Sequence, residues 1–344
     1  MKAAAGRAAE AFAKSGLLSL LEALDRNTDR VRVVAYHRVA ELAEEPDLDP
    51  GLISATPDEF RVQVELVARH YSPISLDDLV AAHRGERTLP PRPVLFTFDD
   101  GYRDFAEHAW PTLQRAGVPA VLFVPTAFPD QPGPGFWWDR LHASLTRTDR
   151  RECEVEGIGR LPLGDAGERR AAHRAIRTRV KDLPHVEAME WLDTTLASLA
   201  DVPSVHRVLG WDALRALARD GLSVCAHGHA HALATRLDPT ELAADLATSK
   251  RAIERELGED TPPAVFAYPS GAEDERTQQA VLEAGFELGF ASGRSIARVP
   301  FLEPARVTRL PMLNYASALF RAQLRPSVAT LGRWLIDERQ AKAA

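Results

Sequence analysis

The sequence predicts an α/β fold in which strands and helices alternate along the chain. Two observations predict it: short apolar runs such as Val31–Tyr36, Pro93–Phe98 and Pro119–Val124, and amphipathic segments between them. This order is typical of a parallel sheet or barrel. A third observation is that residues 128–207 interrupt the alternation with charged sequence of helical character. We interpret this stretch as a mostly helical insertion.

The remaining elements follow this plan in chain order. After the first strand and a loop rich in proline, Thr56-Pro57-Asp58-Glu59 predicts the start of a helix, with Thr56 as N-cap and Glu59 completing a capping box. Beyond the insertion, helices are expected at Trp211–Arg219, Pro239–Leu257 and Gln278–Ala284. Strands are expected between and after them, at Leu222–Ala226, Ala264–Tyr268, Leu288–Ala291 and Val307–Leu310.

Composition is that of a globular protein with one large domain. The chain has 344 residues, of which 45% are hydrophobic, enough to build a sizeable core. The formal net charge of −7 gives no reason to expect a nucleic-acid partner. Two cysteines, Cys153 and Cys225, do not make a disulfide framework for a domain of this size.

The two ends of the chain are expected to be helical. Residues 1–30 predict an amphipathic helix whose apolar face carries Phe12, Leu17, Leu20, Leu21 and Leu24, and residues 316–344 predict a helical tail. Charged residues interrupt the first segment, and nowhere do eighteen apolar residues run together, so neither a signal peptide nor a transmembrane helix is expected. The sequence thus favours a cytoplasmic protein. The first helix either packs on the domain or contacts a membrane surface or partner.

Two adjacent carboxylates, Asp99 and Asp100, directly follow an apolar strand and precede Gly101. In parallel α/β folds, sites are built at the C-terminal ends of strands. Two neighbouring carboxylates repel each other unless a cation neutralises one of them. A helix N-cap is the alternative interpretation, but a cap explains one aspartate and leaves the second without a role.

Three histidines, His227, His229 and His231, lie within five residues after another predicted strand. On a helical turn, His227 and His231 would share one face and reach one metal ion, while His229 would point away. A polar loop with chance histidines is the alternative. Asp100 with these two histidines would make a three-ligand site with an open position, which is typical of a catalytic metal. Mixed nitrogen and oxygen ligands favour Zn²⁺, with Co²⁺, Ni²⁺ and Fe²⁺ as alternatives.

These motifs resemble those of the polysaccharide deacetylase superfamily, carbohydrate esterase family four. Thr97-Phe98-Asp99-Asp100-Gly101-Tyr102 resembles its first motif, His227-Gly228-x-x-His231 its second, and Tyr268-Pro269-Ser270-Gly271 a variant of its third. The resemblance implies a distorted, incomplete (β/α) barrel of about seven strands, formed by residues 31–127 and 208–315 around the insertion at 128–207.

The resemblance also implies residue roles. Asp99 would be the general base, and Asp100, His227 and His231 the metal ligands. The backbone N–H of Ser270 would stabilise the oxyanion. Among the motif residues, Tyr102 and Tyr268 are expected to contact the substrate.

The chain departs from the family pattern at two points. Ala267 stands where the family usually carries the arginine that holds the catalytic aspartate, and Arg309 is the candidate to supply that guanidinium. The family's late Leu-x-His motif, whose histidine acts as the general acid, is absent, because no histidine lies beyond His231. His37, at the end of the first strand, resembles the early histidine of the branch with permuted motifs, typified by poly-N-acetylglucosamine deacetylases. We expect His37 to be the general acid, with a buried structural histidine as the alternative.

A pair of tryptophans, Trp137 and Trp138, opens the insertion and is followed by Asp139. The two rings could form a platform for a sugar, and they are included as expected substrate contacts. Equally, they could anchor the insertion to the barrel, because tryptophan is often a large core residue.

The ligand pattern predicts a metal-dependent enzyme, and the resemblance implies a hydrolase that removes acetyl groups, in the first instance N-acetyl groups, from an acetylated glycan or amino sugar. One alternative is an amidase or esterase of the same fold that acts on a non-sugar or natural-product substrate in a closed pocket. Another is a catalytically silent glycan-binding module, which would not need all four of Asp99, Asp100, His227 and His231.

Overall fold

The computed structural model describes residues 26–43, 47–131, 135–200, 207–293, 295–312 and 317–325. The expected N-terminal helix at 1–30 therefore lies almost wholly outside the described residues. Of the expected C-terminal tail at 316–344, the described part includes one helix, α12 (Ser317–Gln323).

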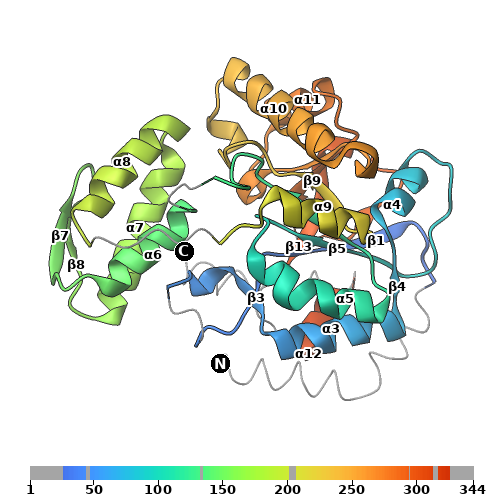
Figure 1. The fold of residues 1–344 in the computed structure, drawn as a ribbon, viewed down its shortest axis with the longest axis horizontal. Helices are drawn as coiled ribbons and strands as arrows, with labels where there is room; N and C mark the ends of the chain where they lie inside the picture. The colour runs from blue at the N-terminus through green and yellow to red at the C-terminus, as the bar shows by residue number, and fades with distance from the viewer. Residues whose placement is uncertain are drawn as a thin grey trace.

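Seven parallel strands close into a ring, and helices surround them (Figure 1). In ring order they are β1 (Arg30–Tyr36), β5 (Pro93–Phe98), β6 (Ala120–Val124), β9 (Ser223–Ala226), β10 (Val265–Ala267), β11 (Leu288–Ser292) and β13 (Val307–Pro311). Each pairs in parallel with the next, and β13 pairs back onto β1. The predicted (β/α) barrel is thus confirmed, with one strand fewer than the eight-stranded form.

The strands form because their side chains are buried on both faces. All six residues of β5 are buried, as expected for a parallel strand with helices outside and a filled barrel inside. Phe123 of β6 and Phe290 of β11 lie 5.4 Å apart between ring centroids. Because β6 and β11 are not neighbours in the ring, this contact crosses the barrel interior. On the outer face, Phe96 and Phe98 pack with Phe60 of the first barrel helix.

Helices cover the outside of the ring. They are α3 (Pro57–His70), α4 (Leu76–His83), α5 (Trp110–Ala116), α9 (Trp211–Arg219), α10 (Pro239–Leu257) and α11 (Glu275–Glu283). The predicted capping box at Thr56 and Glu59 is present at the start of α3. Short helical turns are η1 (Pro50–Leu52), the π-helical η2 (Phe105–Ala109), η3 (Ala234–Arg236), η4 (Gly258–Asp260), η5 (Pro269–Gly271) and η6 (Pro304–Arg306).

Four short strands complete the barrel's surroundings. β4 (Ser72–Pro73) pairs in parallel with β5, and β12 (Ala297–Arg298) runs antiparallel to β1. β2 (Arg38–Val39) and β3 (Ile53–Ala55) form a separate parallel pair directly after His37. This pair fixes the chain that leaves the first barrel strand.

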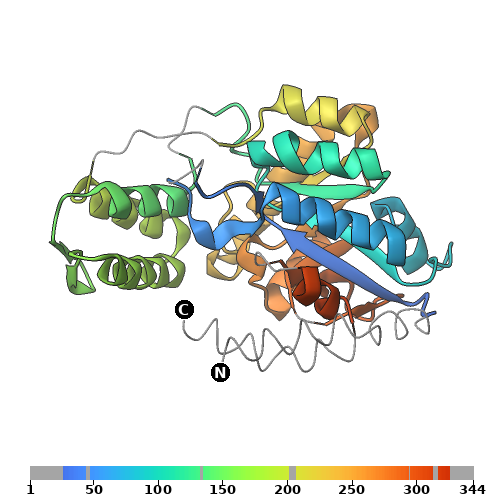
Figure 2. The same ribbon diagram turned by 90° about the horizontal axis from the view of Figure 1, so that it is seen from below.

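The insertion forms a lobe beside the barrel, drawn in green in Figures 1 and 2. It contains α6 (Trp137–Arg147), a hairpin of β7 (Glu152–Val155) and β8 (Gly159–Pro162), α7 (Ala166–Asp182) and α8 (His185–Ala197). The lobe has its own hydrophobic cluster, with Leu141, Ile176 and Leu192 fully buried. It is thus mostly helical, although the sequence does not predict the hairpin. Its expected boundaries at 128 and 207 stay a prediction.

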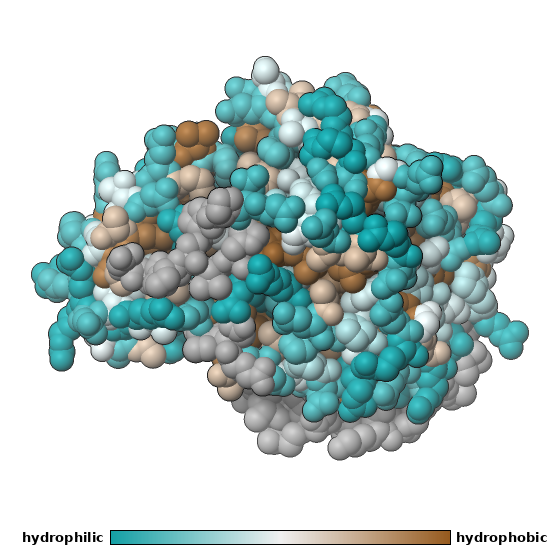
Figure 3. All heavy atoms as spheres, in the orientation of Figure 1, coloured by the Kyte–Doolittle hydropathy of each residue, from teal (hydrophilic) through white to brown (hydrophobic). Residues whose placement is uncertain are grey.

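No helix in the described part of the chain is long and apolar enough to cross a bilayer. On the face shown in Figure 3, hydrophilic residues predominate and apolar residues form small, separate groups. The large apolar side chains exposed among the described residues are scattered, at Leu42, Val186, Leu282 and Leu302. Scattered exposure of this kind is ordinary for a folded domain.

Candidate active site

The ends of the barrel strands bring the predicted site residues to one rim. His37 follows β1, Asp99 and Asp100 follow β5, His227 follows β9, and Ser270 lies in η5 just after β10. Because the strands of the ring are parallel, their carboxyl ends meet on the same side of the barrel.

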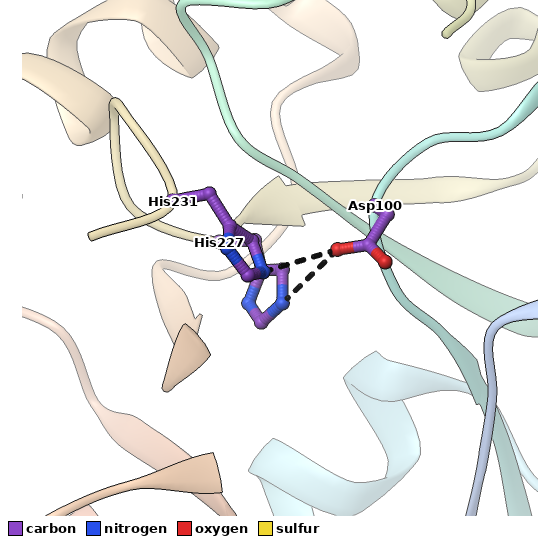
Figure 4. A group of neighbouring side chains, drawn as sticks. All are labelled: Asp100, His227 and His231. Carbon is purple, nitrogen blue, oxygen red and sulfur yellow. Dashed lines mark ion pairs between the residues drawn. The ribbon is translucent and has the colours of Figure 1, made fainter. Parts of the chain in front are cut away.

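Asp100, His227 and His231 form a compact cluster, shown in Figure 4. Their ligand atoms all lie within 4.8 Å of one another. Asp100 Oδ1 lies 3.6 Å from His227 Nε2 and 3.2 Å from His231 Nε2. It is buried and makes no hydrogen bond of acceptable geometry. A buried carboxylate oxygen without a hydrogen bond, facing two imidazole nitrogens, is a donor set suited to a divalent cation.

Burial sets the charge state of His227. Its Nδ1 lies 2.7 Å from the carbonyl oxygen of Ala267, so Nδ1–H donates there and Nε2 keeps its lone pair toward Asp100. Burial lowers the pKa of His227 to about 4, although Asp99 opposes this shift. The imidazole is therefore neutral at neutral pH, which is the form that binds a metal.

The pKa of Asp100 lies below its ordinary value. Burial alone would raise it, but His231, which contributes most, together with His37 and His227 more than offsets burial. Asp100 is therefore a carboxylate across the physiological pH range, as a metal ligand must be.

Strained backbone marks the cluster. Asp100 (φ 73°), His231 (φ 55°) and Ser270 (φ 56°) are three of the five non-glycine residues with positive φ among the described residues. Such conformations cost free energy and concentrate at functional sites. They also correct an expectation: His227 and His231 do not lie on a helical turn. They lie on a loop after β9, in which Gly228 (φ 73°) and His231 turn the chain so that both rings face Asp100.

A carboxylate that sequence reasoning missed holds this loop in shape. Asp245, on α10, accepts hydrogen bonds from the backbone N–H groups of His229 and Ala230, at 3.0 to 3.3 Å. His229 itself turns away from the cluster, with Nδ1 3.0 Å from the hydroxyl of Thr126. No signal in the sequence indicates this role, because Asp245 lies 16 residues after His229 on the next α-helix, outside the histidine motif.

Asp99 is held by two hydrogen bonds from Arg309 in β13. Arg309 Nη1 lies 2.6 Å from Oδ1 and Nη2 2.8 Å from Oδ2. Both side chains are buried, and the guanidinium also stacks over the ring of Phe123 at 5.3 Å, inside the barrel. Burial would raise the pKa of Asp99, but Arg309, with help from His227 and His37, brings it below its ordinary value. Asp99 is therefore ionised and fixed in orientation.

His37 lies beside this pair. Its Nε2 is 4.0 Å from Asp99 Oδ2, and about a third of its side chain is exposed to solvent. Its backbone N–H donates to the Ser54 hydroxyl at 2.9 Å, which ties it to β3. The ring is thus next to the carboxylates and open to an incoming molecule.

A buried arginine supports the chain after His37. Arg38 pairs with Asp139 of α6 at 2.5 Å and with Asp104 at 3.5 Å, and lies 3.7 Å from the ring centre of Tyr102. Burial raises the pKa of Asp104 to about 6, even though Arg38 opposes this shift. Through its ion pair with Arg38, Asp139 links the first helix of the insertion to the barrel.

The two tyrosines are fully buried. The Tyr102 hydroxyl accepts a hydrogen bond from Trp138 Nε1 at 2.9 Å, and the Tyr268 hydroxyl donates to the carbonyl of Ala305 at 2.9 Å. Their substrate contact stays a prediction, to which this burial gives no support.

Of the two interpretations of Trp138, the anchor is favoured. Its ring is nearly buried and packs 4.8 Å from the ring of His231, against the wall of the metal cluster. Trp137 is only partly buried and faces a pocket between the insertion and the barrel. Trp137 can therefore contact a substrate in this pocket, whereas Trp138 is buried and does not line it.

A family model described as polysaccharide deacetylase matches residues 86–289, more than half of the chain. The chain belongs to the polysaccharide deacetylase family. The match spans Asp99, Asp100, His227 and His231 together with the insertion. His37 and Arg309 lie outside it.

Among curated polysaccharide deacetylases, the poly-beta-1,6-N-acetyl-D-glucosamine N-deacetylases of Escherichia coli K12 and O157:H7 are each 32% identical over 100 residues. The match covers 29% of this chain and 14% of each relative. It supports the predicted resemblance to the poly-N-acetylglucosamine-type branch. The chain aligns with only a small part of those longer proteins.

Solved structures share the fold. The Streptococcus pyogenes deacetylase PplD, solved in complex with acetate, superposes with a TM-score of 0.59 at 17% identity, covering 87% of this chain and 99% of PplD. IcaB from Ammonifex degensii gives a TM-score of 0.55 at 17% identity, over 86% of this chain and 97% of IcaB. At this identity the similarity establishes the polysaccharide deacetylase fold alone.

Proposed function

We propose that this member of the polysaccharide deacetylase family is a metal-dependent hydrolase that removes N-acetyl groups from an acetylated amino sugar or glycan. The observation that carries the proposal is the buried cluster of Asp100, His227 and His231 next to an ionised Asp99. A catalytically silent module would have no use for a carboxylate oxygen buried without a hydrogen bond.

Asp100, His227 and His231 would hold the metal, with Zn²⁺ as the first choice for one carboxylate and two imidazoles, and Co²⁺, Ni²⁺ or Fe²⁺ as alternatives. When bound, the cation would polarise the acetyl carbonyl and make water more acidic. The hydrogen bond from His227 to Ala267 supports this role, because it orients the ring and fixes the tautomer.

Asp99 acts as the general base in this proposal. It takes a proton from the attacking water as the water oxygen bonds to the acetyl carbon. Arg309 engages both carboxylate oxygens, and we propose that it positions Asp99 and keeps it ionised. The N–H of Ser270, on the rim beside His231, would donate to the oxyanion that forms on the acetyl group.

His37 acts as the general acid. The amide nitrogen must be protonated as its bond to the acetyl carbon breaks, because an amide anion is a poor leaving group. Proximity to Asp99 and partial exposure support His37 in this role. The competing histidines of the insertion are His142, His173, His185 and His206. His173 lies 3.8 Å from Asp49, and His206 lies outside the described residues. The products are acetate and a free amine.

The proposal is tested by acetate release from matched N-acetylated and O-acetylated sugars, N-acetylglucosamine oligosaccharides of several linkages, and non-sugar acetamides. Each is assayed with the purified protein after chelation and after addition of Zn²⁺. We expect acetate from N-acetylated sugars, lost on chelation and restored by Zn²⁺. Turnover of non-sugar acetamides alone would favour the amidase alternative. No acetate from any substrate with a full complement of metal would reject the proposal.

A further inference from the structure

A pocket lies between the insertion and the barrel, directly beside the metal cluster. The insertion contributes Trp137, Lys181 and His185, and the barrel loops contribute His231, Arg236 and Ser270. The rest of the lining is apolar. Because one wall carries a proposed metal ligand and the proposed oxyanion donor, a group in this pocket would be part of a substrate bound for reaction.

The charged groups of this pocket are all nitrogen donors. Lys181 and Arg236 supply two cations and His185 a further ring nitrogen, and no carboxylate lines the pocket among the described residues. Acidic groups lie close to this lining without being part of it. Asp182 lies 3.5 Å from Arg236, and Asp245 and Glu241 act on His185. The charged side chains in the lining itself, Lys181 and Arg236, are therefore both cationic.

Lys181 is the most informative of these residues. Its ammonium makes no hydrogen bond or ion pair with any described residue, yet its pKa is lowered by burial and, secondarily, by Arg177. Its place in the last turn of α7 suits a cation, because the helix C-terminus is the negative end of the helix dipole. The side chain is half-buried in the wall of the pocket, and its ammonium has no acidic partner among the described residues, so it is available to an anion that enters the pocket.

Direct contacts hold the end of this lysine's helix next to the loop at residues 227–231, here called the metal loop, which carries two proposed metal ligands. Arg236 lies in η3, shortly after His231, and its Nε donates to the backbone carbonyl of Lys181 at 3.1 Å. The same guanidinium pairs with Asp182 at the end of α7. The end of this insertion helix is therefore held against the loop that carries a proposed metal ligand.

We propose that this pocket is a subsite for an anionic substituent of the substrate, a carboxylate or a phosphate, bound by Lys181 with Arg236. The proposal rests on the proposed deacetylase function and adds a substrate class: acetylated amino sugars that carry a negative charge. The anionic group would bind against the insertion while the N-acetyl group reaches Asp99 and the metal ligands.

The test uses matched methyl glycosides of N-acetylglucosamine: the neutral parent, its C6 carboxylate and its 6-phosphate, together with N-acetylglucosamine 1-phosphate. Acetate release gives kcat and KM for each. The unmodified protein should favour at least one anionic substrate over the neutral glycoside by about tenfold or more in kcat/KM. The difference should lie mainly in KM, because hydrogen bonds to charged groups contribute binding free energy on this scale. The carboxylate and phosphate arms distinguish the two anions.

Lys181→Gln should abolish the preference, lowering kcat/KM for the anionic substrates to that for the neutral glycoside, whereas Lys181→Arg should retain it. Arg170→Gln is the matched control, because it removes one positive charge from an exposed position on the same helix and should keep the preference. Equal or better use of the neutral glycoside, or an anionic preference that survives Lys181→Gln, would overturn the subsite. No acetate from any substrate would instead reject the underlying function.

Discussion

Asp99 and Asp100 are neighbours in the chain, yet they face different partners. Asp99 meets the guanidinium of Arg309, whereas Asp100 has left-handed backbone (φ 73°) and faces two imidazoles. The turn between strand and loop thus separates two carboxylates that would otherwise repel each other. We infer different roles for them from these partners.

Arg309→Gln should slow deacetylation by about ten- to a hundredfold while leaving metal content unchanged, because Asp99 loses its orienting partner. Without the guanidinium, burial raises the pKa of Asp99, so the ionised base appears only at higher pH. The acidic limb of the kcat/KM profile should therefore move to higher pH. Arg306→Gln, an exposed arginine shortly before β13, is the control. An acidic limb that stays in place in Arg309→Gln would show that Arg309 does not set the base.

His37→Ala should keep the metal but slow acetamide substrates by about 10²- to 10⁴-fold. Aryl acetates should be affected far less, because their leaving groups depart without protonation. His70→Ala, on the outer helix α3, should change neither rate. Equal losses on acetamides and aryl acetates would make His37 a structural residue and direct attention to His185, which lines the pocket.

At the scale of elements, the first helix of the insertion supports the barrel's metal loop. Trp138 packs on His231 and donates to Tyr102, which follows the aspartate pair. The next residue, Asp139, pairs with Arg38, which follows His37. The start of helix α6 and the rim of the barrel therefore pack together as one unit.

Trp138→Ala should weaken metal binding by about ten- to a hundredfold, the usual cost of losing a residue that supports a ligand. Trp137→Ala removes the adjacent indole, which contacts the pocket instead, and should leave metal affinity unchanged. Metal titration with a competing chelator measures both. If the two variants bind metal equally well, the packing against His231 has no role in holding the ligand.

The sequence predicts the barrel elements well because their signals are local. The run from Pro93 to Phe98 is apolar throughout, as a strand buried on both faces must be, and the strand forms over these same residues. The capping box at Thr56 and Glu59 is equally local. The hairpin of β7 and β8 escapes prediction because its strands are short and lie among charged helices.

The site is only partly predictable, because long-range contacts shape it. The spacing of His227 and His231 indicates a shared ligand role but suggests a helical turn, whereas the loop is shaped by Gly228 and by Asp245 from α10. Likewise, nothing near Lys181 in the sequence indicates that its ammonium lies beside the metal loop. That proximity follows from how the insertion packs on the barrel.

At the scale of the whole molecule, closure of the ring brings distant residues together. β13 pairs with β1, so Arg309 enters the interior beside strands that stand more than two hundred residues earlier in the chain. This closure explains how Arg309 can hold Asp99 although Ala267 stands where the family usually places its arginine. The insertion adds a second wall to the same rim, and with it the proposed selectivity for charged sugars.

The most direct test of the central claim is the metal stoichiometry of Asp99→Asn and His231→Ala, measured by elemental analysis after loading with Zn²⁺ and removal of excess metal. Acetate release is followed on the same samples. We predict that Asp99→Asn retains the metal content of the parent protein while turnover falls by about 10²- to 10⁴-fold, and that His231→Ala loses most of its metal together with its activity. A metal-free Asp99→Asn, or a His231→Ala with full metal content, would contradict the account.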